Sequence, residues 1–474
     1  MKFIVPSMAA CAVLLAACAD SPVQPTTARV ATASPAVAAG GSKRVVEFNG
    51  AVRKDFAARV AALGGTVDFV SETGGFAGVS GLTAEAASTL ERQAGVGSVY
   101  DDYVVQLTTP TTIGNVVSEE VSTNSVNNPA AALGFGFQWN MRAIGANVAW
   151  AAGNLGSPNV TAAILDSGMD YDSPDMNGMI DLGRSASFVP SDNAIINAFF
   201  PGRNPIDDLN SHGTNVATQA ASAGAFFAGV TSKTRLMAVK VLGQSGNGSI
   251  AGFLAGLIWA ADHGADVANM SLGIPGFVDK AGSKGLIGLQ NRVFNYANRA
   301  GMVIVVGAGN DALNMDNVGR GFSAYCEAPH VVCVSATGPT ASADPFRGPW
   351  ANVDAGAPYS NTGRKTVTVS APGGTAAGWV SSICARHTAI AVGAAFAFPC
   401  NAPPGSFFVL GAAGTSQAAP HVTGLVAQLI AKYGKGNPSQ IKQLLLNSLD
   451  DLGPPGPDDV YGAGRINVVK ALSQ

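Results

Sequence analysis

The segment at residues 161–168 constrains the fold of this chain more than any other. It opens with Thr-Ala-Ala-Ile-Leu, a short apolar run of the kind found in strands that are buried on both faces. The run stops at Asp166, and Ser167 and Gly168 then favour a turn. Open α/β sheets carry their chemistry at the carboxyl ends of parallel strands, so the segment indicates a fold of that class with Asp166 as a candidate functional residue.

Composition allows a large core and disfavours nucleic-acid binding. The chain has 474 residues, of which 47% are hydrophobic and only 12% are charged, against about 25% charged in ordinary globular proteins. This length corresponds to about three domains, or to one large domain with appendages. The net charge is −3 and no stripe of Lys and Arg is present, so we expect no nucleic-acid partner.

Two later segments add the residue types of a nucleophilic site. Residues 211–217 place His212 before a glycine and a run of small residues, and residues 414–421 place Ser416 among small residues. A Gly-Thr-Ser stretch alone is more often a turn or a helix cap. The chain order Asp166, His212, Ser416 is nevertheless the order of subtilisin, and it differs from that of chymotrypsin and of the α/β-hydrolases.

With these three motifs the chain resembles the subtilisin-like serine proteases over about residues 138–468. Residues 302–310 look like the family strand that ends in the oxyanion-hole Asn, here Asn310, and residues 461–467 resemble the terminal signature of the family. The resemblance implies a three-layer α/β fold with a mostly parallel central sheet at residues 138–474. It also implies a serine endopeptidase in which Ser416 attacks the peptide carbonyl, His212 transfers the proton and Asp166 orients His212.

The resemblance further implies how a protein or peptide substrate binds. Residues 269–273 and 308–309 would form opposite walls of the pocket for the side chain before the scissile bond (P1). Residues 242–248 would form an edge to which the substrate adds as a strand. The walls are uncharged and favour an apolar P1 side chain, whereas Asp311 at the rim would attract a basic one. The expected substrate-binding residues are Leu242, Gly243, Gly246, Gly248, Ser271, Leu272, Gly273, Ala308 and Gly309.

A small α+β module is expected at residues 43–107, before the catalytic domain. Hydrophobic spacing predicts strands at 44–48, 66–70, 75–80 and 96–105, with helices at 54–63 and 83–93. This order is ferredoxin-like and resembles the inhibitor-type propeptide of the family, which acts as intramolecular chaperone and inhibitor. We expect a linker with the maturation site at 108–137 and residues 104–112 in the active cleft. An independent α+β binding domain is the alternative.

The N-terminal residues indicate export. Residues 1–17 suit a signal peptide, and the run that ends at Cys18 resembles the lipobox of bacterial lipoproteins, in which that cysteine carries lipid. Residues 18–42 are rich in Ala, Pro, Thr and Ser and are expected to form a flexible tether. The protein would then be a monomer of the cell envelope, held to the membrane through lipid only. An ordinary cleaved signal would instead release it to the medium.

Four cysteines remain in the body, namely Cys326, Cys333, Cys384 and Cys400. An even number in an exported protein favours disulfides, and three pairings exist. We favour Cys326 with Cys333 and Cys384 with Cys400, because each closes a local loop next to a motif, whereas free buried thiols are the alternative. Residues 375–411 are expected to be a long insertion.

No cofactor is expected for the chemistry. The resemblance gives Asp175 as a candidate calcium ligand, but the facing loop at 221–229 is shorter than in the family and lacks the expected Asn. Calcium at this place is therefore doubtful.

Two other functions remain compatible with the sequence. One is a catalytically silent binding protein that keeps the fold. The other is an acyl-transfer enzyme, such as a peptide ligase or an esterase, that uses the same three residues.

Overall fold

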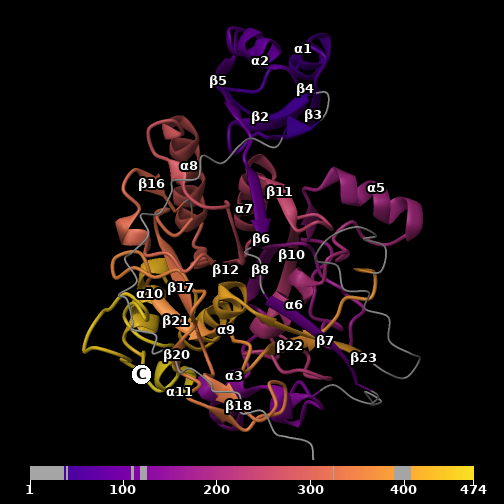
Figure 1. Ribbon diagram of the computed structural model, residues 1–474. Coiled ribbons are helices and arrows are strands. Elements are labelled where there is room, and N and C mark those ends of the chain that lie inside the picture. Colours follow the sequence, from indigo (N-terminus) through magenta and orange to yellow (C-terminus); the bar gives the residue numbers. More distant parts are fainter. Residues whose placement is uncertain (1–36, 39–40, 108–110, 118–124, 324, 389–406) are drawn as a thin grey trace, which may run out of the picture.

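The computed structural model describes residues 37–38, 41–107, 111–117, 125–323, 325–388 and 407–474. These ranges form a small N-terminal module above a larger body (Figure 1). The expected signal peptide, Cys18, most of the tether and Cys400 lie outside the described residues. Within the described ranges, no helix is long and apolar enough to cross a membrane.

The body is built on a mostly parallel sheet with the strand order β20-β17-β15-β12-β8-β10-β9, and β21 also pairs with β17. Of these pairs only β17 with β20 is antiparallel. The strand expected at the opening segment is β8, in the middle of the sheet. The strands are β8 (Thr161–Asp166), β9 (Ala186–Ser187), β10 (Arg235–Lys240), β12 (Val267–Met270), β15 (Val303–Gly307), β17 (Val331–Gly338), β20 (Ala355–Gly356) and β21 (Val369–Pro372).

Helices cover both faces of this sheet, and alternating side chains fill the two layers between. On β8, Ala162 and Ile164 lie in one core with α6 (His212–Ala220), α9 (Thr415–Tyr433) and α10 (Pro438–Leu446). Ala163 and Leu165 lie in the other core with α7 (Ile250–Asp262) and α8 (Lys284–Arg299). Strands buried on both faces are what the apolar runs predicted. The expected three-layer α/β fold is confirmed.

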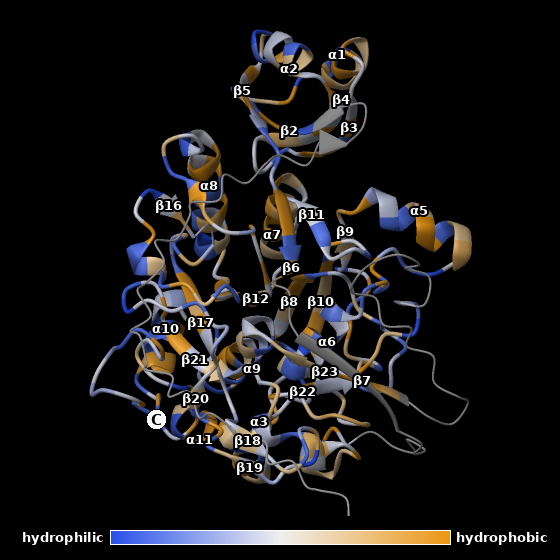
Figure 2. Cartoon of the chain, viewed as in Figure 1, coloured by the Kyte–Doolittle hydropathy of each residue, from blue (hydrophilic) through white to orange (hydrophobic). Residues whose placement is uncertain are grey.

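Local sequence explains where these helices lie. Helix α7 begins at Ser249, whose side chain accepts a hydrogen bond from the Gly252 amide at 3.0 Å, and Gly264 follows its end with φ +75°. Helix α8 buries one face only, and Figure 2 shows both hydrophobic and hydrophilic colour on it.

Helix α9 contains a proline that changes its hydrogen bonding near Ser416. An amide N–H at position 420 would bond the carbonyl of Ser416 one turn earlier, but Pro420 has no N–H. The Ser416 carbonyl instead accepts the hydroxyl of Ser271 at 2.7 Å. The proline therefore makes room for a bond between α9 and the segment that follows β12.

The smaller elements of the body surround this frame. The helical ones are η1 (Pro129–Ala131), η2 (Phe135–Phe137), α3 (Trp139–Ala143), α4 (Ala146–Ala151), α5 (Pro190–Phe199), η3 (Met315–Asn317) and α11 (Val468–Ala471). The strands are β7 (Thr111–Val117), β11 (Asn247–Ser249), β13 (Leu272–Gly273), β14 (Val278–Asp279), β16 (Gly321–Phe322), β18 (Ala341–Ser342), β19 (Trp350–Ala351), β22 (Val380–Ile383) and β23 (Phe407–Ala413).

The N-terminal module is an antiparallel sheet in the order β3-β4-β2-β5, extended by β1. Helices α1 and α2 share a core with one face of the sheet, whereas Val45 and Phe76 on the other face belong to the core that contains α7 and α8. The module thus rests on the body by its sheet (Figure 1). Its elements are β1 (Val37–Ala38), β2 (Gly41–Phe48), α1 (Phe56–Ala62), β3 (Thr66–Ser71), β4 (Phe76–Leu82), α2 (Ala84–Glu91) and β5 (Val96–Asp101).

The strand expected at 96–105 is divided, which corrects the sequence-based boundary. Strand β5 ends at Asp101, and β6 (Val104–Leu107) leaves the module and pairs with the body. Between them, the Asp102 carboxylate accepts the Ile250 amide at 2.8 Å, at the start of α7. A carboxylate at a helix N-terminus is favourable, so Asp102 anchors the chain where it changes direction.

Candidate active site

Asp166 and His212 meet at the carboxyl end of β8. Asp166 is fully buried, and its Oδ1 lies 2.8 Å from His212 Nδ1. The same oxygen accepts the Ser167 amide at 2.7 Å. The Nε2 atom of His212 is buried and makes no hydrogen bond to a described residue. The contact with Asp166 therefore fixes the orientation of the ring.

A second carboxylate, Asp208, holds the start of the helix that carries His212. Its Oδ2 accepts the Thr214 amide at 2.9 Å, and its Oδ1 accepts the Ser211 amide at 2.9 Å. Burial opposes protonation of His212, but the charges of Asp166 and Asp208 and the hydrogen bond to Asp166 raise its pKa above the ordinary value. Asp208 was not predicted from the sequence, although an Asp shortly before a helix start is a capping signal.

Ser416 lies in the first turn of α9 and is fully buried. Its hydroxyl donates to the carbonyl of Ser271 at 3.2 Å, and its own carbonyl accepts the Ser271 hydroxyl. Asn269 supports Ser271, because its Nδ2 donates to Ser271 Oγ at 2.9 Å. Two reciprocal bonds thus connect Ser416 to the expected wall of the P1 pocket.

Asn310 follows β15 and lies next to the start of α9. Its Oδ1 accepts both the amide and the hydroxyl of Thr415, at 2.9 and 3.0 Å. The Thr415 hydroxyl also accepts the Gly309 amide at 3.0 Å. Because the amide oxygen of Asn310 is directed at Thr415, its Nδ2 group lies on the other branch of the side chain. The role of Thr415 in orienting this amide was not predicted from the sequence.

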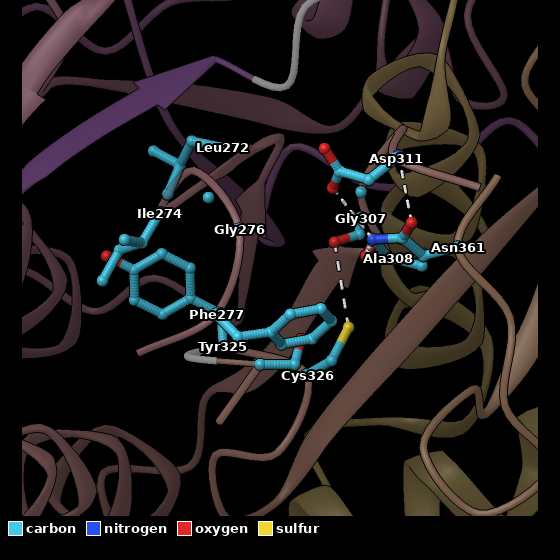
Figure 3. A pocket seen from close by; sticks show the side chains of 13 residues that line it. Leu272, Ile274, Gly276, Phe277, Gly307, Ala308, Asp311, Tyr325, Cys326 and Asn361 are labelled. Carbon is cyan, nitrogen blue, oxygen red and sulfur yellow. Dashed lines mark hydrogen bonds between the residues drawn. The ribbon is translucent and has the colours of Figure 1, made fainter. Parts of the chain in front are cut away.

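A cavity of about 40 Å³ lies between the two expected walls. Leu272 and Ile274 line one side and Ala308 lines the other (Figure 3). Gly309 also lines the cavity. Of the expected substrate-binding residues, Leu272, Gly273, Ala308 and Gly309 line the cavity, and Ser271 does not.

The sequence did not predict that Asn361, Tyr325 and Cys326 line this cavity. Asn361 Nδ2 donates to the Ala308 carbonyl at 3.0 Å and to Asp311 Oδ2 at 3.2 Å, so it fixes one wall. Tyr325 and Cys326 complete the lining (Figure 3). Gly309 has φ +102°, and a Cβ there would lie 2.4 Å from Asn361 Nδ2, which explains the need for glycine.

The chain's own strand β6 lies next to this cavity, because it pairs with β13, whose residues Leu272 and Gly273 line the cavity. It pairs antiparallel with β11 on one side and with β13 on the other. The Leu107 amide donates to the Gly246 carbonyl at 2.9 Å, and Val105 lies opposite Gly248. A Cβ on Gly246 would lie 2.4 Å from the side chain of Leu107, so glycine is needed for this approach. The other two expected residues, Leu242 and Gly243, lie just before this edge.

Strand β7 lies next to the strand that precedes Ser416. It pairs antiparallel with β23, with Thr111 opposite Ala413 and Val117 opposite Phe407. Strand β23 leads directly into Gly414, Thr415 and Ser416. Residues 104–107 therefore pair with the strand that follows Ser271, and residues 111–117 pair with the strand that leads into Ser416.

The other four histidines have different partners. His421 is buried between the Gln417 carbonyl and Asn140, and burial lowers its pKa to about 4. His263 stacks on Trp259, and His330 bonds Asn295. The Nδ1 atom of His387 lies 2.6 Å from the buried carboxylate of Asp207. Sequence spacing could not show that pair, because its members are 180 residues apart.

The donor set around Asp175 does not fit calcium. The carboxylate accepts the Phe226 amide at 2.7 Å and the Phe227 amide at 3.1 Å. Calcium requires oxygen ligands, whereas these N–H groups present hydrogen atoms to the carboxylate. Gln138 is likewise bonded to the loop, through the amide and the carbonyl of Ala228 at 2.8 and 2.7 Å. Among the described residues, no group of three or more His, Cys, Asp and Glu side chains is arranged to hold a metal.

The expected disulfide between Cys326 and Cys333 is confirmed. It connects the cavity lining to β17. Cys384 is also disulfide-bonded, and its expected partner Cys400 lies outside the described residues.

Comparison with known proteins identifies the family. Residues 157–464 match the Subtilase family of peptidases. The thermophilic serine proteinase of Bacillus sp. (strain AK1) is 31% identical over 341 residues, which cover 71% of this chain and 67% of that protein. Thermitase of Thermoactinomyces vulgaris is 29% identical over 313 residues, which cover 65% of this chain and 87% of that protein.

A solved structure of the same family has a similar fold. Fervidolysin of Fervidobacterium pennivorans, described as a keratinolytic enzyme related to subtilisin, matches with a TM-score of 0.63 and 25% identity over 92% of this chain. The chain covers 61% of the fervidolysin chain. The protein therefore belongs to the subtilase family. Within that family it is a subtilisin-like serine endopeptidase.

Proposed function

We propose that this chain hydrolyses internal peptide bonds of proteins through Asp166, His212 and Ser416, and that it is made as a zymogen. Ser416 Oγ attacks the substrate carbonyl, while His212 Nε2 takes the hydroxyl proton. The proton then passes to the leaving amine, and an acyl-enzyme on Ser416 remains. Water attacks this ester with His212 again as base, which releases the acid and restores the serine.

The surroundings of each group support its role. His212 Nδ1 is bonded to Asp166, so Nε2 is the nitrogen left for proton transfer. The tetrahedral intermediate carries a negative oxygen, which the Asn310 Nδ2 group and the Ser416 amide at the start of α9 would stabilise. The bonds from Thr415 hold Asn310 in place before the substrate arrives, so little reorganisation is needed during the reaction.

One observation favours a peptide over a small ester as substrate. Strand β6 is a stretch of polypeptide that lies between β11 and β13, beside the cavity at Leu272 and Gly309. A groove that pairs with backbone on both sides recognises an extended chain and tolerates many side chains. We therefore propose broad specificity with an apolar P1 preference.

The same strand supports the zymogen proposal. The module at 43–107 rests on α7 and α8 and places its end in the cleft, where a substrate would lie. Leu107 pairs opposite Leu272, which follows Ser271, and Thr111 pairs opposite Ala413 in the strand that leads into Ser416. We therefore propose that the maturation cut lies between Leu107 and Thr111. Until that cut is made, the module would act as an inhibitor, and it would assist folding of the slow-forming parallel sheet.

Maturation tests this part of the proposal. The purified wild-type chain should shorten to a product that begins between residues 108 and 111, as found by N-terminal sequencing, while Ser416→Ala stays at full length. Equal shortening of both proteins would show that another protease makes the cut.

Casein turnover tests the peptidase proposal. The matured wild type should degrade casein, and Ser416→Ala, matured by an added protease, should not. Hydrolysis of a nitrophenyl ester without any casein cleavage would identify an esterase instead.

We also propose that residues 1–17 direct export and that lipid on Cys18 anchors the protein in the envelope. In cells fed labelled palmitate, the wild type should carry the label in the membrane fraction, whereas Cys18→Ala should not. Release of an unlabelled wild type to the medium would favour the ordinary signal.

A further inference from the structure

A hydrogen bond between two buried amides joins the helices of His212 and Ser416. Asn215 lies one turn beyond His212 on α6, and Gln417 follows Ser416 on α9. Gln417 Nε2 donates to Asn215 Oδ1 at 3.1 Å. Both side chains are at most 1% exposed, so water does not compete for the bond.

Asn215 also ties α6 to the strand β22. Its Nδ2 donates to Ser382 Oγ at 2.9 Å. One turn further along α6, Gln219 Nε2 donates to the Ser381 carbonyl at 2.9 Å. Asn215 and Gln219 lie on the same side of α6, so their hydrogen bonds to β22 resist both sliding and rotation of the helix.

The bonds close into a ring that includes α3. His421 donates from Nδ1 to the Gln417 carbonyl at 2.7 Å, and its Nε2 accepts Asn140 Nδ2 at 2.8 Å. Asn140 Nδ2 also donates to Gln219 Oε1 at 3.1 Å. Burial lowers the pKa of His421, so the imidazole is neutral and the ring contains no charge.

We propose that Asn215 and Gln417 are positioning residues that fix the distance between His212 and Ser416. This inference rests on the proposed function of those two residues. A shift of α6 against α9 would break a buried hydrogen bond, so the pair holds the helices at one separation. Proton transfer is sensitive to that separation, because a misplacement of about 1 Å costs on the order of 10²-fold in rate. Since the ring is neutral, it should not change the pKa of His212.

A double-mutant cycle separates positioning from stability. Asn215→Leu or Gln417→Leu alone leaves the partner amide buried without its bond, so we expect a lower Tm for each. The double variant removes both members of the pair, so it should recover part of the loss in Tm. We expect kcat to fall about 10- to 100-fold in all three variants, because none of them restores the link between the helices. KM should stay within about twofold of the wild-type value, and the pH midpoint of kcat/KM should stay within about 0.2 pH units of it.

Gln428→Leu is the matched control. Gln428 is also a buried glutamine on α9, and its Nε2 donates to the Val230 carbonyl at 2.5 Å, twelve residues beyond Ser416. This variant should have a lower Tm than the wild type and the same kcat. If Asn215→Leu does not fold, the cycle is repeated with Asn215→Ala and Gln417→Met.

Two results would overturn the inference while leaving the proposed function intact. One is a wild-type kcat in Asn215→Leu. The other is a double variant in which kcat and Tm both recover toward the wild-type values, because the pair would then act through stability only. A wild type that does not cleave casein would refute the proposed function, and the inference with it.

Discussion

The bond between Ser271 and the Ser416 carbonyl gives a quantitative prediction about stability. Pro420 leaves that carbonyl without its helical partner, and the Ser271 hydroxyl at 2.7 Å satisfies it. We expect Ser271→Ala to remove the hydroxyl that this fully buried carbonyl accepts. We expect Pro420→Ala to supply an N–H one turn along α9, which would satisfy the same carbonyl.

The magnitude follows from the burial of the site. A buried polar group that loses its partner costs about 1–3 kcal/mol. A domain of about 340 residues unfolds with an entropy of roughly 0.7 kcal/mol/K, at about 2.1 cal/mol/K per residue. Ser271→Ala should therefore lower Tm by roughly 1.5–4 °C. In the Pro420→Ala background the cost of the same change should fall below about 1 kcal/mol, because the new amide takes over the carbonyl.

Differential scanning calorimetry of the four proteins measures this coupling. All four should carry Ser416→Ala, which keeps the backbone and prevents self-digestion during heating. An equal cost of Ser271→Ala in both backgrounds would refute the reasoning. It would mean that the Ser416 carbonyl does not depend on Ser271.

Three further predictions concern catalysis and calcium. Asn310→Leu should lower kcat by about 10²–10³-fold with little change in KM, measured with an active-site-titrated enzyme; an unchanged kcat would remove Asn310 from the oxyanion site. Because the raised pKa of His212 must be passed before the ring is neutral, kcat/KM should rise with pH through a midpoint above about 6.5. Asp208→Asn removes a negative charge and should move that midpoint to lower pH, whereas a midpoint that moves up or stays would contradict the charge argument. Chelation by EDTA should leave Tm unchanged, whereas Asp175→Ala, which removes the acceptor of the Phe226 and Phe227 amides, should lower it. A large loss of Tm on chelation would show that calcium stabilises the protein elsewhere.

The sequence predicted those parts of the molecule that depend on local pattern. The apolar run before Asp166 predicted β8, and His212 and Ser416 each lie at the start of a helix. The pair Cys326 and Cys333 was predicted because the two residues are seven positions apart. Such features need only the short-range order of residues, which a single sequence contains.

The support of the site was not predictable from the sequence. Asn361 reaches Ala308 across 53 positions, and Gln417 reaches Asn215 across 202. These contacts exist only because the parallel sheet brings distant segments to one edge. The division between β5 and β6 was missed for the same reason, since Asp102 caps a helix 148 positions later.

Fluorophosphonate labelling of the matured protein tests the proposed nucleophile without assuming any substrate. Tandem mass spectrometry should find one label per chain, on Ser416, and His212→Ala should slow labelling at least a hundredfold because the hydroxyl loses its base. A label on another residue, or a labelling rate that does not depend on His212, would contradict the proposed triad.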